Sequence, residues 1–155
     1  MLKIEYLDGG EEQFISIKPL WEKIKEHHKN VSTYFSEYFE QKNFEERRLE
    51  LLDKSKDSCL KIFLAKDMSL NKFVGYCIAT IDRNKVGEID SIYIEPDYRK
   101  NGLGENLMRK ALDWMESKQV RSKKMIVAVG NEDVFDFYKQ FNFYPRSITL
   151  EEKED

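Results

Sequence analysis

The chain has 155 residues, which suits a single domain over residues 1–155, and its 41% hydrophobic content is enough for a core. With 26 basic and 29 acidic residues, the net charge of -3 lacks the strongly basic character of nucleic-acid-binding proteins. No apolar run approaches the ~20 residues of a membrane helix, and the first residues lack the apolar segment of a signal peptide. We therefore expect a cytoplasmic protein that binds neither nucleic acid nor membranes.

The N-terminal half combines strand-like and helix-like spacing of apolar residues. Residues 2–7 alternate weakly and predict a first strand, which Gly9 and Gly10 close. The predicted elements that follow are helices over residues 17–31 and 36–52 and strands over residues 58–65 and 73–82. Short polar turns join these strands, and such turns imply antiparallel pairing.

The C-terminal half predicts a strand–helix–strand unit and then two short elements. In chain order these are a strand over residues 86–94, a helix over 103–115, a strand over 125–129, a helix over 134–141 and a strand over 147–150. Because residues 125–129 are continuously apolar, that strand is expected to be central in its sheet. The crossover implies a parallel pair, so the predicted fold class is α/β with a mixed sheet flanked by helices.

The loop after the strand at residues 86–94 is the most informative feature of the sequence. Pro96 stops the strand, and Gly102 and Gly104 precede a helix, whose N-terminal N–H groups suit a phosphate. A P-loop would need a terminal Lys-Ser/Thr, and a dinucleotide fingerprint would need a small residue at Leu107. The pattern that remains is Arg/Gln-x-x-Gly-x-Gly/Ala, beginning at Arg99; the alternative is a plain tight turn.

A second block of residues accompanies this loop at the spacing of a known family. It consists of Asn131, Val134, Phe137, Tyr138, Phe141 and Phe143. The strand, the loop and this block together resemble the GNAT superfamily of acetyl-CoA-dependent N-acetyltransferases. The resemblance implies a GNAT-like, mostly antiparallel twisted sheet with splayed middle strands and about four flanking helices. Two residues depart from the family pattern, Val134 for Ala and Asn142 for Gly, and we expect Asn142 to adopt the left-handed conformation that ends the helix.

The resemblance also implies a binding site for acetyl-CoA as co-substrate. The main chain of the strand would pair with the pantetheine arm, and the N–H groups of the loop would hold the pyrophosphate. The implied cofactor-binding residues are Ile92, Tyr93, Ile94, Arg99, Lys100, Asn101, Gly102, Leu103, Gly104, Glu105, Asn131 and Tyr138. No metal is expected, because two cysteines and two histidines lack metal-site spacing.

Two residues are candidates for acid–base catalysis in direct transfer to an amine. By its family position, Tyr138 would protonate the departing thiolate as general acid; the alternative is an ordinary core tyrosine with a satisfied hydroxyl. Glu88 would accept a proton from the amine, with Asp90 as a rival and a solvent-exposed glutamate as the alternative. Strict alternation puts Glu88 on the side of Asp90, Ile92 and Ile94, unless a bulge breaks that parity.

The acceptor side is less defined by the sequence. His28 and Tyr34 are candidate substrate-binding residues, because the first two helices of the family form that wall; ordinary packing is the alternative. The acceptor is expected to be a small-molecule amine or a protein amine, attacking in a ternary complex. A homodimer and a monomer both stay open, and a non-catalytic acyl-CoA sensor is the alternative function.

Overall fold

The computed structural model describes residues 2–56 and 59–154, which divide into two compact units. The first unit comprises the residues up to 24 and residues 43–126, and the second comprises residues 25–42 and those from 127 onward. Helix α1 (Phe14–Val31) begins in the first unit and ends in the second. In the described part of the chain, no helix is long and apolar enough to cross a membrane.

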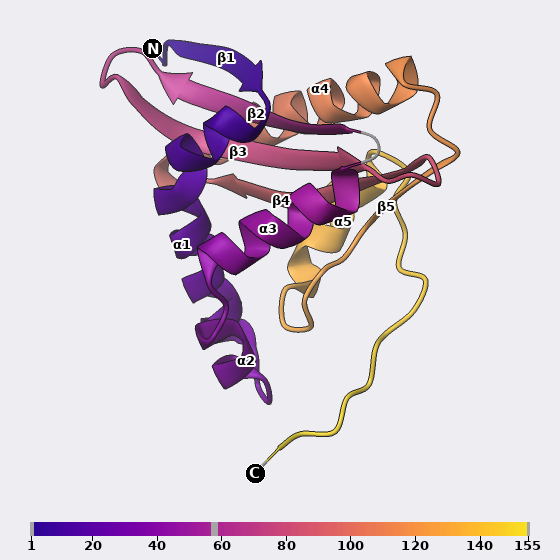
Figure 1. The fold of residues 1–155 in the computed structure, drawn as a ribbon. Helices are drawn as coiled ribbons and strands as arrows, with labels where there is room; N and C mark the ends of the chain where they lie inside the picture. The colour runs from indigo at the N-terminus through magenta and orange to yellow at the C-terminus, as the bar shows by residue number, and fades with distance from the viewer. Residues whose placement is uncertain (1, 57–58, 155) are drawn as a thin grey trace. The chain divides into compact units, whose positions relative to one another are not determined.

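The first unit is built on a five-stranded sheet (Figure 1). Its strands are β1 (Ile4–Gly9), β2 (Cys59–Asp67), β3 (Lys72–Ile81), β4 (Val86–Ile94) and β5 (Ser122–Met125). They lie in the order β1-β2-β3-β4-β5, with antiparallel pairs throughout except for the parallel pair of β4 and β5. This mixed, mostly antiparallel sheet confirms the predicted fold class and the parallel crossover.

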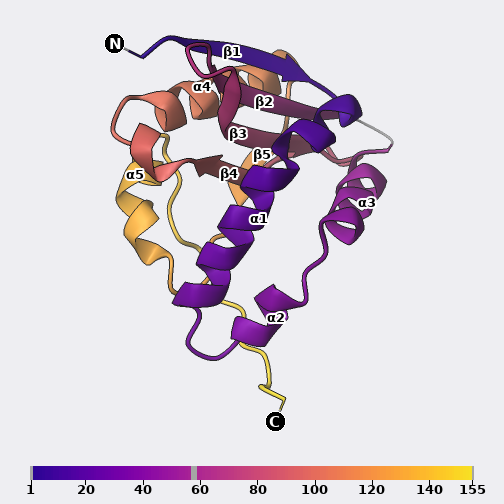
Figure 2. The ribbon, with the colours of Figure 1, turned by 90° about the vertical axis from the view of Figure 1, so that its left-hand side faces the viewer.

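Helices cover both faces of this sheet. The first part of α1 and helix α3 (Phe44–Ser55) pack on one face, and helix α4 (Leu103–Ser117) packs on the other (Figures 1 and 2). The buried core under α1 and α3 consists of Phe14, Ile17, Leu20, Trp21, Phe44, Leu51, Ile62, Leu64, Tyr76, Ile78 and Tyr93. On the opposite face, a Cβ on Gly87 would lie 2.7 Å from Met115 Sδ, so glycine lets α4 approach β4 closely.

The helix predicted over residues 36–52 is instead two helices, α2 (Ser36–Glu40) and α3. The break falls at Asn43, whose extended backbone cannot continue a helix and whose side chain accepts a hydrogen bond from the N–H of Glu46 at 3.2 Å. This is N-capping, which satisfies one of the unpaired N–H groups of the first turn of α3. The sequence carried this signal, but the aromatic periodicity across it concealed the break.

Two predictions of strands near the C-terminus are wrong. Where a central strand was predicted over residues 125–129, the structure has β5, which ends at Met125 and lies at the edge of the sheet. Ile126 and Val129 are 80% and 64% exposed. Residues 147–150 form no strand within the described chain, and Ile148 is 75% exposed. Strand propensity reflects packing against neighbouring strands, so apolar composition alone did not decide these segments.

The second unit contains α2 and the short helix α5 (Phe135–Lys139), which follows a 3₁₀ turn (Glu132–Val134). Asn142 has φ of 68°, and the N–H of Phe143 donates to the carbonyl of Tyr138 at 3.2 Å. A left-handed residue followed by such a bond is the usual end of a helix. The expectation that Asn142 replaces glycine at this stop is confirmed.

Candidate functional site

Strand β4 carries a bulge in the middle of its length. Ile78 of β3 pairs with Ser91, but the next residue, Ala79, pairs with Ile89. Asp90 is therefore an extra residue that has no counterpart in the strand register of β3, and such a bulge changes the direction of the strand. The sequence allowed for a bulge, but its position depends on β3 and could not be read from β4 alone.

The bulge changes which side chains share a face of the sheet. Glu88 contacts α3, and Tyr93 belongs to the core beneath α1 and α3. Ile94 lies on the α4 side, because a Cβ on Gly75 would meet Ile94 Cδ1 at 2.6 Å and Leu107 Cδ1 at 3.5 Å. Strict alternation, which would put Glu88 on the side of Ile94, is therefore wrong for this strand.

Strands β4 and β5 pair along only the first part of β4. The last partners are Ile89 and Met125, and residues 90–94 continue past them. Within the described residues, this stretch of β4 has no β5 partner on its outer edge. Unpaired N–H and C=O groups on a strand edge can bind an extended ligand by main-chain hydrogen bonds.

The loop between β4 and α4 contains two residues with left-handed backbone angles. Lys100 has φ of 64°, and Gly102, the N-cap residue of α4, has φ of 81°. Nothing lies within 4 Å of where a Cβ on Gly102 would be, so it is the backbone angle and not crowding that favours glycine there. Among the described residues, no side chain caps α4. The first N–H groups of this helix, with its positive dipole end, suit an anion.

Hydrogen bonds and one buried side chain hold this loop against the rest of the first unit. Asn101 Nδ2 donates to the carbonyls of Tyr98 and Arg99 at 3.3 and 3.0 Å. The Tyr98 hydroxyl donates to the buried Asp67 carboxylate, and this bond raises the pKa of Tyr98 to about 12. Leu103 is 2% exposed and anchors the start of α4 in the core. The loop backbone is therefore fixed before any ligand binds.

Arg99 lies against the end of β4. Its guanidinium carbon is 5.7 Å from the centre of the Tyr93 ring, and its Nε donates to the carbonyl of Ile94 at 3.0 Å. Glu95 forms an ion pair with Lys23 of α1. The guanidinium of Arg99 therefore lies at the C-terminal end of β4. The adjacent carboxylate of Glu95 is paired with Lys23 and not with Arg99.

Glu88 and Asp90 converge on Lys54, a residue that the sequence did not single out. Lys54 Nζ lies 3.2 Å from Glu88 Oε1 and also bonds Asp90 Oδ1. Asp90 Oδ2 accepts a 2.6 Å hydrogen bond from Thr80. The Asp90 side chain is 0% exposed, and burial raises its pKa while Lys54 and Thr80 lower it. Both candidate bases thus occur in one charged group at the bulge.

The remaining candidates belong to the second unit. Asn131 Oδ1 lies 3.0 Å from His27 Nε2. His28 is half-buried with its ring 5.5 Å from that of Phe39, and burial lowers its pKa to about 4. Tyr34 is 68% exposed. The contact of His28 fits ordinary packing, and a substrate-binding role for His28 and Tyr34 stays a prediction.

Tyr138 lies on α5 and is half-buried, with its ring 5.3 Å from the ring of Phe137 in an edge-to-face contact. Phe137 in turn contacts Phe141 at 5.3 Å. Three aromatic residues of the block that resembles the family, Phe137, Tyr138 and Phe141, are therefore packed together. These contacts fit packing and leave the catalytic role of Tyr138 as a prediction.

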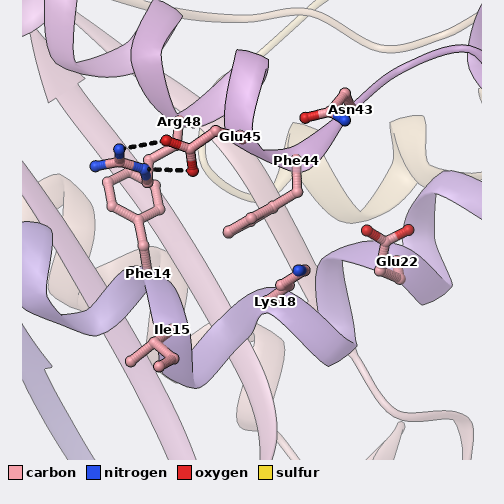
Figure 3. A pocket seen from close by; sticks show the side chains of 8 residues that line it. All are labelled: Phe14, Ile15, Lys18, Glu22, Asn43, Phe44, Glu45 and Arg48. Atoms are coloured by element: carbon pink, nitrogen blue, oxygen red, sulfur yellow. Dashed lines mark hydrogen bonds and ion pairs between the residues drawn. The ribbon is translucent and has the colours of Figure 1, made fainter.

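A cavity of about 380 Å³ lies between α1 and α3 in the first unit (Figure 3). Its lining residues are Phe14, Ile15, Lys18, Glu22, Asn43, Phe44, Glu45 and Arg48. On the α3 side of the cavity, Arg48 pairs with Glu45. None of these residues belongs to β4 or its loop, so this cavity is separate from the candidate donor site. No group of three or more potential metal ligands occurs among the described residues.

The model of the acetyltransferase (GNAT) family matches residues 21–143. The chain belongs to the GNAT family of acetyltransferases. An uncharacterized N-acetyltransferase of Methanocaldococcus jannaschii is 34% identical over 71 residues, which cover 46% of this chain and 31% of that protein. A Bacillus subtilis protein, provisionally named a ribosomal protein bS18-alanine N-acetyltransferase, is 32% identical over 87 residues, 56% of this chain and 55% of that protein. The chain thus spans between about a third and about half of the length of these relatives.

Solved structures of GNAT acetyltransferases share the fold. The aminoglycoside N-acetyltransferase AAC(6')-Iy in complex with CoA has a TM-score of 0.65 at 13% identity, covering 97% of this chain and 99% of that chain. Glucosamine-6-phosphate N-acetyltransferase from Arabidopsis thaliana has a TM-score of 0.62 at 16% identity, covering 99% of both chains. At these identities the likeness is one of fold, and it confirms the expected GNAT architecture.

Proposed function

We propose that this GNAT chain is, as a single domain, an acetyl-CoA-dependent N-acetyltransferase that acts on a primary amine. The observation that carries the proposal is the loop between β4 and α4. Its left-handed Gly102 exposes the uncapped N-terminus of α4, directly after a strand whose outer edge lacks a β5 partner. An anion site next to an open strand edge suits a ligand with a pyrophosphate and an amide-containing arm.

The donor would be bound mainly by the main chain. N–H groups of residues 100–105 would hold the pyrophosphate, and the edge of residues 92–94 would pair with the pantetheine amides. Arg99 adds positive charge at the same end of β4. Bound this way, the thioester would point along β4 toward the bulge at Asp90, where the candidate bases lie.

The transfer would be a direct attack in a ternary complex. Glu88, 11% exposed in its side chain, would accept the proton of the ammonium, and the amine would attack the thioester carbonyl. A backbone N–H near Ile94 would stabilise the oxyanion, and Tyr138 would protonate the departing CoA thiolate. The support for Tyr138 is its place in the family pattern. Holding two substrates together would supply much of the acceleration.

The acceptor class proposed here is a primary amine on a small molecule or at a protein N-terminus. Relatives and neighbours are named for an alanine of a ribosomal protein, for aminoglycosides and for glucosamine-6-phosphate. His28 and Tyr34 are the proposed acceptor-side residues, since both lie in the α1–α2 segment.

Release of free thiol from acetyl-CoA, measured against a panel of these amines, tests the proposal. We expect turnover with at least one amine class and a KM for acetyl-CoA between about 1 μM and 1 mM. Binding of acetyl-CoA without turnover on any amine would instead identify a non-catalytic sensor. An intact, folded sample that binds no acetyl-CoA at millimolar concentration would contradict both.

A further inference from the structure

A buried group of charges lies between α3 and the bulge of β4. Lys54, close to the end of α3, places its ammonium between the carboxylates of Glu88 and Asp90. Asp90 lies two residues after Glu88, so alternation along β4 puts both carboxylates on the α3 side, where both reach Lys54. The bulge at Asp90 changes the parity only beyond this point, so that Tyr93 and not Ile94 shares the α3 side.

The surroundings of these carboxylates are nearly dry. The side chains of Asp90 and Glu88 are 0% and 11% exposed, and that of Lys54 is 31% exposed. From β3, Thr80 donates to Asp90 and the buried Cys77 lies close enough to interact electrostatically. From β5, Lys124 Nζ lies 3.8 Å from Glu88 Oε1, but its side chain is 53% exposed. Lys54 is thus the better-shielded cation and the one that contacts both carboxylates.

We propose that Lys54 is a positioning residue for the general base, because its ammonium lies between the carboxylates of Glu88 and Asp90 and holds both toward one point beside the bulge. This inference rests on the proposed function of Glu88. Lys54 itself is not proposed to contact either substrate. It acts through the two carboxylates, as a fixed positive charge supplied by α3.

A cation is needed beside these carboxylates because two negative charges that are close together and shielded from solvent are unfavourable. Burial favours the neutral form of a carboxyl group, and a like charge nearby adds to that effect. Without Lys54, burial and Glu88 both act to raise the pKa of Asp90, and the hydrogen bond from Thr80 is the opposing contact that stays. Two such carboxylates titrate as a pair and share a proton up to a higher pH. A pair that holds a proton is a poorer acceptor for the proton of the amine.

The test compares the pH profile of kcat/KM for the acceptor amine in three variants. Lys54→Met removes the charge, Lys54→Arg keeps it, and Lys56→Met removes an exposed lysine that follows the same helix and pairs with Asp53. For Lys54→Met we expect the acidic limb of the profile to move up by about one pH unit or more. Lys54→Arg and Lys56→Met should keep the limb within a few tenths of a unit of the wild type.

A second readout is independent of turnover. Carbon-13 NMR of the side-chain carboxyl groups, with Asp90→Asn to assign the Asp90 signal, follows the titration directly. Asp90 should titrate at higher pH in Lys54→Met than in the wild type. If wild-type protein releases no thiol, the proposed function fails, while this titration still decides whether Lys54 controls the ionisation of Asp90.

A double variant distinguishes the loss of the positive charge from simple misfolding of Lys54→Met. Lys54→Met/Asp90→Asn removes the cation together with one of the two like charges, so the acidic limb should return toward the wild-type position. A merely structural role of Lys54 would leave the single variant less stable but with an unmoved limb. An unmoved limb together with an unmoved Asp90 titration in folded Lys54→Met would overturn the proposal.

Discussion

The β4–α4 loop of the first unit, the proposed donor site, is held by main-chain geometry, whereas the second unit presents aromatic side chains on short helices and on the segments beside them. In the loop, Gly102 and Lys100 have left-handed angles, and Asn101 and Tyr98 bond the surrounding chain. In the second unit, the rings of Tyr34, Tyr38 and Tyr144 are exposed. A main-chain site recognises what all donors of one class share, while side chains are free to vary with the acceptor. The donor can therefore be inferred from local sequence, and the acceptor cannot.

The largest effect that separates the two regions is expected for Tyr138→Phe in the second unit. Removal of the hydroxyl deletes the proposed acid, and general acid catalysis is worth about 100-fold or more. We expect kcat to fall by roughly that factor while the Kd for acetyl-CoA stays within about twofold, because the proposed donor contacts lie mainly in the loop.

Tyr144→Phe is the matched control, since Tyr144 lies in the same unit and is 64% exposed. Steady-state kinetics and calorimetric titration measure both quantities. An unchanged kcat in Tyr138→Phe would remove Tyr138 from the acid role and make it a packing residue of the aromatic cluster.

The second-largest effect is expected for a substitution in the β4–α4 loop. Gly102→Val forces a branched side chain onto a φ of 81°, at a cost of about 1–3 kcal/mol, and places methyl groups over the N-terminus of α4. We expect acetyl-CoA to bind at least about tenfold more weakly, which is about 1.4 kcal/mol.

Asn71→Val imposes the same strain on a φ of 53° in the β2–β3 turn and serves as the control. It should lower stability without weakening binding, as measured by thermal unfolding and titration. Equal losses of affinity in both variants would mean that the effect comes from stability and not from the loop.

A third effect concerns the pH dependence of stability in the second unit. Burial holds the pKa of His28 at about 4, against about 6.5 in the unfolded chain. Between these values the unfolded chain binds the extra proton, so the free energy of unfolding falls as the pH drops from about 6.5 to about 4.

In His28→Gln this contribution disappears, so stability should depend less on pH in that window than in the wild type or in His27→Gln. Chemical denaturation at several pH values measures the slopes. Equal slopes in all three proteins would show that His28 does not carry this dependence.

The smallest effect is expected for Tyr98→Phe, which removes the hydrogen bond to Asp67 but leaves the loop backbone intact. The pKa of Asp67 is lowered mainly by this bond, and the variant should melt a few degrees lower. Donor affinity should fall only a few-fold, because Asn101 still bonds two loop carbonyls.

Tyr6→Phe, which removes a hydroxyl bonded to exposed Asn106, is a suitable control. Thermal melts and acetyl-CoA titration of both variants give the comparison. A loss of affinity as large as that of Gly102→Val would mean that Tyr98, and not the left-handed glycine, decides the loop conformation.

The sequence predicted the loop because its structure is local. A glycine at a left-handed position and an asparagine that stops a helix act through their own backbone angles, so Gly102 and Asn142 could be interpreted one by one. The parallel crossover from β4 through α4 to β5 followed from the order of the elements.

The carboxylate group could not be predicted in the same way, because it depends on partners far apart in the chain. The bulge at Asp90 is defined by its register with β3, and Lys54 reaches it from α3. In the sequence, Lys54 looks like any solvated lysine near Lys56. The apolar run at residues 125–129 was misplaced for a related reason, since strand position depends on the strands beside it.

Backbone amide NMR of the wild-type protein during addition of CoA tests the donor site most directly. We expect the largest shift changes at the amides of residues 100–105 and 92–94, with saturation below about 1 mM. Shifts confined to the α1–α3 cavity, or no shifts at millimolar CoA, would contradict the assignment of the loop as the donor site.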